Sequence, residues 1–116
     1  MTDLDKLLAT LRQFSDERGW SNYHRPKDML LKLMEEVGEV AEQFGWQTNE
    51  EILASLKDDQ RKQAIGDELA DVLIVLLTLM DAVDLVIEEA FNRKVKKNAL
   101  KYPVGRDVEK VKKIKS

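Results

Sequence analysis

Two pairs of acidic residues with helical spacing are the part of this sequence best suited to chemistry. Glu36 and Glu39 stand three positions apart, and so do Glu68 and Asp71. Residues three or four positions apart lie on the same face of a helix, so each pair would present two carboxylates together. Both pairs sit beside apolar residues rather than in the middle of a polar face. If the two helices pack against each other, four carboxylates meet near the edge of the core.

A bound cation is the expected partner of these carboxylates, because they cannot all stay charged and buried without one. Mg²⁺ suits them, since it takes oxygen ligands in octahedral geometry and keeps water and phosphate oxygens in its shell. A ferritin-like di-iron site would need Glu-x-x-His on two helices, and the only histidine, His24, lies in an expected loop. The alternative is that each acidic pair belongs to a solvated helix face, as single pairs most often do. Two pairs on consecutive long helices favour the metal site.

The elements that position these pairs are predicted from apolar residues that recur with the helical period. The first helix begins after Thr2 or Asp3 and ends at Gly19, and residues 20–25 form a loop. The other expected helices cover residues 26–44, 50–56, 59–83 and 85–100. Thr48 and Glu51 form a capping box for the short helix, and Asp84 is the expected cap of the last one.

The second half of the predicted helix over residues 59–83 is apolar nearly all round. Residues 72–80 contain a single polar side chain, Thr78. A helix of this kind is buried on every side, and one chain of 116 residues can hardly cover it. We therefore predict an all-α, four-helix-bundle-like fold that is completed by oligomerisation.

Composition and charge indicate one domain with a distinct tail. Charged residues make up 35% of the chain, cysteine is absent, and no apolar run approaches the roughly 20 residues of a membrane span. We predict a cytoplasmic protein without a signal peptide. The net charge of −3 divides into about −11 for residues 1–91 and +8 for residues 92–116. Residues 1–105 are expected to form the domain, and residues 106–116 a basic tail that is disordered or partly helical.

The order and spacing of these residues resemble the MazG-like all-α nucleoside triphosphate pyrophosphohydrolases, in particular their dCTP pyrophosphatase branch. The likeness covers roughly residues 4–104. The motifs that carry it are Glu35-Glu36-x-x-Glu39, Glu68-x-x-Asp71, Trp20-x-x-Tyr23-His24-x-Pro26, Trp46, and Lys94…Asn98…Tyr102-Pro103-Val104. The resemblance implies Mg²⁺-dependent hydrolysis of a (deoxy)nucleoside triphosphate to the monophosphate and pyrophosphate. It also implies nucleotide-pool house-cleaning, with dCTP or a related nucleotide as substrate.

The resemblance also implies roles for single residues. Glu36, Glu39, Glu68 and Asp71 would be the Mg²⁺ ligands, and Glu35 would orient a ligand or act as general base. The implied substrate-binding residues are Trp20, His24, Trp46, Lys94, Asn98 and Tyr102. The tryptophans would stack on the base, and Lys94 and Asn98 would face the phosphates. The alternatives are core or interface packing for the tryptophans and an ordinary surface position for Lys94 and His24.

The sequence departs from that branch at two positions. A histidine is expected near Leu11 and a tyrosine near Val75, and both positions are aliphatic here. The preferred base therefore stays open. The resemblance further implies a homo-oligomer, either a dimer or a tetramer built from dimers. Two competing hypotheses are a non-catalytic helical scaffold and, ranked lower because the body is acidic, a nucleic-acid binder acting through the basic tail.

Overall fold

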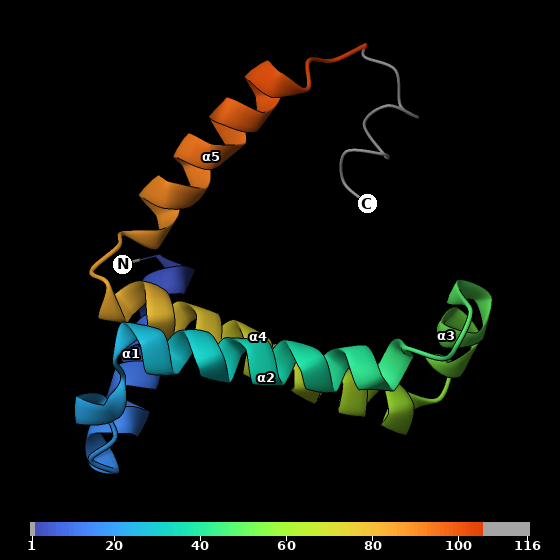
Figure 1. Cartoon of the computed structure of the whole chain (residues 1–116), viewed down its shortest axis with the longest axis horizontal. Coiled ribbons are helices and arrows are strands. Elements are labelled where there is room, and N and C mark those ends of the chain that lie inside the picture. The colour runs from blue at the N-terminus through green and yellow to red at the C-terminus, as the bar shows by residue number, and fades with distance from the viewer. Residues whose placement is uncertain (1, 106–116) are drawn as a thin grey trace. The chain divides into compact units, whose positions relative to one another are not determined.

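The computed structural model describes residues 2–105, and all regular secondary structure in this range is helical (Figure 1). The elements are α1 (Asp3–Glu17), the short 3₁₀ helix η1 (Ser21–Tyr23), α2 (Pro26–Phe44), α3 (Asn49–Ser55), α4 (Asp59–Ala82) and α5 (Ile87–Lys101). The predicted all-α class is confirmed. Residues 106–116 lie outside the described range, so the predicted domain boundary at residue 105 stays a prediction.

Three helices begin at residues whose side chains cap the free backbone N–H groups of the first turn. The Thr2 hydroxyl accepts a hydrogen bond from the Asp5 amide, and the Asp5 carboxylate accepts one from the Thr2 amide. Thr48 and Glu51 form the same reciprocal pair at the start of α3, as predicted. Asp58 accepts from the Gln60 amide and starts α4.

The turn between α4 and α5 corrects one prediction. Asp84 does not cap the last helix; its φ of 61° places it in the left-handed region, directly after the C-cap residue Val83. Aspartate tolerates this region better than most residues, because its short polar side chain can bond locally. The helix α5 starts later, at Ile87, with Val86 as an N-cap that makes no side-chain hydrogen bond.

The unit Met1–Asp84 is built around an antiparallel pair of long helices. In Figure 1, α2 and α4 lie side by side, with α1 at one end of the pair and α3 at the other. Arg12 on α1 bonds Asp81 on α4 through its Nε at 3.1 Å and its Nη2 at 2.5 Å. At the opposite end, Arg61 on α4 bonds the side chain and the carbonyl of Gln43 on α2, at 2.6 and 3.1 Å. Arg12 therefore links α1 to α4, and Arg61 links α4 to α2.

Little apolar surface is buried within the described residues. The buried apolar side chains are Leu8, Ile65 and Leu77, and the single buried charged residue is Glu36. The segment from Leu85 onward forms a second compact unit that contains α5. No helix of residues 2–105 has the length and apolar character that crossing a membrane requires.

Candidate metal and nucleotide site

Three of the predicted ligands meet between the two long helices. Carboxylate oxygens of Glu36 and Glu39, from α2, and of Glu68, from α4, all lie within 4.8 Å of one another. The positions follow from the Arg61–Gln43 contact. Glu36 precedes Gln43 by about two helical turns, and Glu68 follows Arg61 by the same distance along an antiparallel helix. The packing of α2 on α4 therefore brings the two acidic motifs together.

Glu36 is the carboxylate with the most unusual surroundings. It is only 8% exposed, and its Oε2 has no hydrogen-bond partner. Its Oε1 lies 3.2 Å from Nζ of Lys32, one turn earlier on α2. A buried carboxylate oxygen without a partner is costly. This orphaned oxygen points to a ligand that completes its environment.

The cluster carries a strong local negative charge. The carboxylate of Glu36 raises the pKa of Glu39 above its usual value, and Glu68 and Glu35 raise it further. The same negative charge raises the pKa of Lys32, first through its bond to Glu36 and then through the charge of Glu35. Like charges at this distance repel, and a divalent cation among them would reverse the repulsion.

The residues present fit a magnesium ion. They offer only carboxylate oxygens, which are the donors that Mg²⁺ and Ca²⁺ accept, and no histidine or thiolate that a softer metal would prefer. One donor is buried and lacks a partner, while Glu39 is exposed and open to water and substrate. Three carboxylates would leave coordination positions for water and phosphate oxygens.

Two further acidic residues from the predicted set lie beside this cluster. Asp71 is exposed and follows Glu68 by one turn of α4, but it is not part of the group within 4.8 Å. Glu35 lies next to Glu36, with its side chain 61% exposed and its Oε1 3.7 Å from Nζ of Lys32. The roles of Asp71 as a ligand and of Glu35 as a base stay predictions.

A largely apolar pocket of about 210 Å³ is linked to the cluster by Lys32, which lines the pocket and bonds Glu36. Its walls come from α1, the η1 region, α2 and α4, and they include Leu11, Phe14, Trp20, His24, Met29, Lys32, Ile74 and Val75. Trp20 is held by an edge-on contact with Phe14, with ring centroids 5.6 Å apart. An apolar cavity of about 150 Å³ can hold benzene, so this pocket has room for a flat ring.

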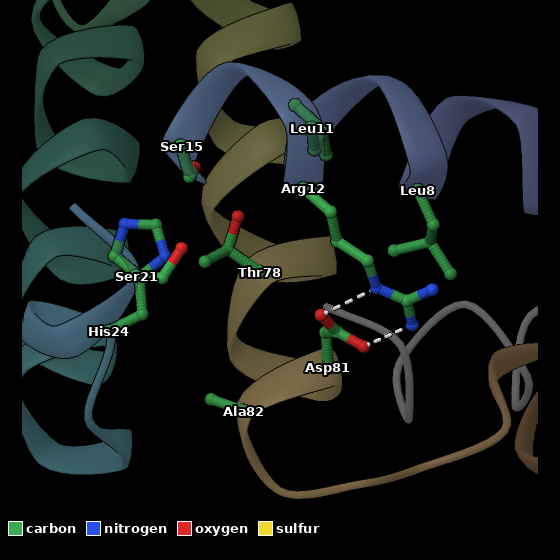
Figure 2. Close-up of a pocket in the computed structure, with 9 residues that line it drawn as sticks. All are labelled: Leu8, Leu11, Arg12, Ser15, Ser21, His24, Thr78, Asp81 and Ala82. Carbon is green, nitrogen blue, oxygen red and sulfur yellow. Dashed lines mark hydrogen bonds and ion pairs between the residues drawn. The ribbon is translucent and has the colours of Figure 1, made fainter. Parts of the chain in front are cut away.

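A second, smaller pocket of about 140 Å³ adjoins the first (Figure 2). The two share Leu11, Ser15, His24 and Thr78 in their walls. Figure 2 shows Arg12 reaching from α1 to Asp81, and both side chains line this pocket. The hydrogen bond and charge of Arg12 lower the pKa of Asp81, so the pair stays ionised at neutral pH.

The remaining predicted substrate contacts are Trp46 in the first unit and three residues of the second unit. Trp46 is 98% exposed after the end of α2 and lines neither pocket. Lys94 and Asn98 are exposed on α5, and Tyr102 is the C-cap of that helix, all in the second unit. Their contact with a nucleotide stays a prediction.

Three of the residues at this site, Lys32, Arg12 and Asp81, were not identified from the sequence. Lys32 could have been found, because it stands four positions before Glu36 and therefore shares its helix face. Arg12 and Asp81 carry no such signal. They are 69 positions apart, and only the packing of α1 on α4 joins them.

Comparison with known proteins now decides the family. Residues 34–115 match the sequence profile of the MazG-like family. The chain belongs to the MazG-like family. The family that the acidic and aromatic motifs together resemble is thus confirmed.

Individual relatives and one solved structure agree with this assignment. The chain is 36% identical to the Bos taurus and Homo sapiens proteins named dCTP pyrophosphatase 1, over 104 and 103 residues. These matches cover 90% and 89% of this chain but 60% and 59% of the relatives, so it spans about three-fifths of their length. A crystal structure of a pyrophosphatase from Archaeoglobus fulgidus superposes with a TM-score of 0.79 at 40% identity. That match covers 89% of this chain and 94% of the other.

Proposed function

We propose that this MazG-like protein hydrolyses a (deoxy)nucleoside triphosphate to the monophosphate and pyrophosphate, with Mg²⁺ as cofactor. The observation that carries the proposal is the cluster of Glu36, Glu39 and Glu68, which Lys32 links to a pocket that can hold a flat ring. The names of the relatives, dCTP pyrophosphatase 1 and a pyrophosphatase, support the same reaction. Removal of surplus or non-standard nucleotides, dCTP or a related one among them, is the biological role that we propose.

The chemistry follows from the carboxylates. Glu36, Glu39 and Glu68 would hold the metal, with Asp71 as the predicted fourth ligand. When bound, Mg²⁺ supplies neutralisation of phosphate charge and a lowered pKa for a bound water. The water oxygen attacks the α-phosphorus, and the bond from that phosphorus to the α,β-bridging oxygen breaks. Pyrophosphate leaves with this oxygen, and Glu35 is the candidate that accepts the proton of the water.

The reaction is tested by product analysis on a panel of NTPs and dNTPs, with Mg²⁺ and with EDTA. We expect at least one nucleotide to give equal amounts of monophosphate and pyrophosphate, and only with Mg²⁺. Because Leu11 and Val75 leave the pocket walls largely apolar, the panel must include every common base and modified cytidines. Release of orthophosphate instead of pyrophosphate, or cleavage of nothing on the panel, would contradict the proposal.

Trp20 is the aromatic residue that we propose stacks on the base, because it is the tryptophan that lines the pocket. Stacking of a base on an aromatic side chain contributes about 1–3 kcal/mol, so Trp20→Ala should raise KM about 5- to 160-fold and lower kcat much less. Steady-state kinetics on the best substrate of the panel measure this. Trp20→Phe keeps a stacking face and is the matched control. An unchanged KM in Trp20→Ala would assign Trp20 to packing against Phe14 alone.

We further propose that the protein is a homo-oligomer, a dimer or a dimer of dimers. In the stretch predicted to be buried on all sides, residues 72–80, only Leu77 is buried, and Leu73, Ile74 and Leu76 are 38–47% exposed. The neighbouring face of α2 is equally open, with Leu30, Leu31, Met34 and Val37 at 48–63%. Exposed apolar side chains on both of the paired helices are what an association surface would present. A second copy of the chain would cover it with the same apolar faces.

Sedimentation at micromolar concentration tests the oligomer. We expect a mass of at least two chains of 13.4 kDa. Leu73→Glu should lower this mass, because it places a charge in the apolar face of α4. Gln60→Glu, at an exposed polar position of the same helix, should leave it unchanged. A monomeric wild-type protein would contradict the proposal.

The predicted cytoplasmic location agrees with a nucleotide substrate and stays a prediction.

A further inference from the structure

Lys32 lies at the junction of the carboxylate cluster and the apolar pocket. Its ammonium is 3.2 Å from Glu36 Oε1 and 3.7 Å from Glu35 Oε1. Its side chain also lines the pocket of about 210 Å³, as the only lysine or arginine among the described residues that do so. One flexible cation therefore touches both the proposed metal site and the proposed base site.

The bond between Lys32 and Glu36 is unequal in its surroundings. The side chain of Lys32 is 46% exposed, whereas that of Glu36 is 10% exposed. A lysine so open to solvent contributes little through a surface ion pair. The buried carboxylate, by contrast, needs a positive charge. Lys32 thus supplies the charge compensation of Glu36 as long as no other cation is present.

A metal ion among Glu36, Glu39 and Glu68 would change this balance. It would compete with the ammonium of Lys32 for Glu36 and would repel it. The lysine side chain is a flexible stem of four carbons that ends in an ammonium group, which binds phosphate as a point charge. Since the stem already lies along the pocket wall, the ammonium can leave Glu36 and stay next to the pocket, where the triphosphate of a bound nucleotide would meet the metal.

We propose that Lys32 exchanges partners during binding: it pairs with Glu36 in the metal-free protein, and it contacts a phosphate oxygen of the substrate when Mg²⁺ occupies the carboxylates. This assignment rests on the proposed function, because it takes the carboxylates as the metal site. It makes Lys32 a substrate-binding residue that links metal binding to nucleotide binding. A purely structural ion pair would stabilise the helix face and would have no such link.

The exchange predicts effects of opposite sign for Lys32→Met, which keeps the apolar stem and removes the charge. Binding of Mg²⁺ alone, measured by calorimetry, should become about threefold tighter or more, because a competing cation is lost. Binding of the non-hydrolysable analogue α,β-imido-dCTP with Mg²⁺ should become about 10-fold weaker or more, because a charged phosphate contact is lost. Lys27→Met, an exposed lysine in the first turn of the same helix, should change neither value.

Selective acetylation of lysines followed by peptide mass spectrometry tests the same exchange in the wild-type protein, so it does not depend on the variant folding. Mg²⁺ alone should raise the labelling of Lys32 about twofold or more, since the ammonium is released from Glu36. Mg²⁺ with α,β-imido-dCTP should remove this gain. Lys27 should be labelled equally in all states.

Two results would overturn the role of Lys32 and leave the proposed function intact: a wild-type protein that binds Mg²⁺ while Lys32→Met binds it no more tightly, or labelling of Lys32 that Mg²⁺ does not change. A wild-type protein that binds no Mg²⁺ would overturn the proposed function and the role of Lys32 together.

Discussion

Glu39→Gln is expected to lower Mg²⁺-dependent turnover by more than about 100-fold while the protein stays folded. Glu39 contributes one of the three carboxylates that lie within 4.8 Å of one another, and glutamine has its shape without its charge. Loss of groups that only orient a metal ligand already costs about 10- to 100-fold, so loss of a ligand itself should cost more. Product release from the best substrate of the panel measures the effect.

Stability measurements separate a lost ligand from a damaged fold. Because Glu39 is exposed, Glu39→Gln should melt within a few degrees of the wild-type protein in EDTA. Mg²⁺ should raise the melting temperature of the wild-type protein, since a ligand that binds only the native state stabilises it. The variant should lose most of this rise. Glu42→Gln, one turn further along α2 and outside the cluster, should behave as wild type in both assays. Full turnover in Glu39→Gln would remove Glu39 from the ligand set.

Leu77→Ala is expected to destabilise the protein by about 2–5 kcal/mol, which is the range for a buried leucine cut to alanine. Leu77 is 4% exposed, the lowest value among the buried apolar side chains Leu8, Ile65 and Leu77. Only three apolar side chains are buried among residues 2–105, so loss of one of them removes a large part of the core. Chemical denaturation followed by circular dichroism measures the change, provided that protein concentration is held constant for an oligomer.

Leu53→Ala is the matched control for this substitution. Leu53 lies on the short helix α3, where the same substitution of leucine by alanine can be made at a side chain that is 66% exposed. Its truncation should change the free energy of unfolding by about 0.5 kcal/mol or less, as at most surface positions. Equal destabilisation by the two substitutions would show that the core around Leu77 is not what holds the chain together.

Much of the helical framework could be predicted because its signals are local. The capping box of Thr48 and Glu51 and the stop at Gly19, which has a φ of 67°, depend on residues a few positions away. The start of the last helix was placed wrongly at Asp84. Aspartate is favourable both as a helix cap and in the left-handed backbone region. Here Asp84 adopts the left-handed conformation, in the turn that follows α4.

The candidate site could be predicted only in part. The spacing of Glu36 and Glu39 places both on one face of α2, whichever partner that face meets. Whether Glu68 or Asp71 approaches them depends on the rotation of α4 about its own axis. The second half of that helix is apolar nearly all round, so its periodicity does not define the rotation. The structure brings Glu68 into the group, and Asp71 stays one turn away from it.

By itself, then, the sequence determined the helices, the acidic pairs on their faces and the family to which the chain belongs. The physical reason is that caps, helical period and motif spacing act over a few residues. Only the tertiary structure decided that Trp20 lines a pocket while Trp46 is exposed, and that Lys32 borders both pocket and carboxylates. Those outcomes depend on how α2 and α1 pack on α4. The Arg61–Gln43 contact, 18 positions apart in the sequence, joins α4 to α2, and the Arg12–Asp81 contact, 69 positions apart, joins α1 to α4.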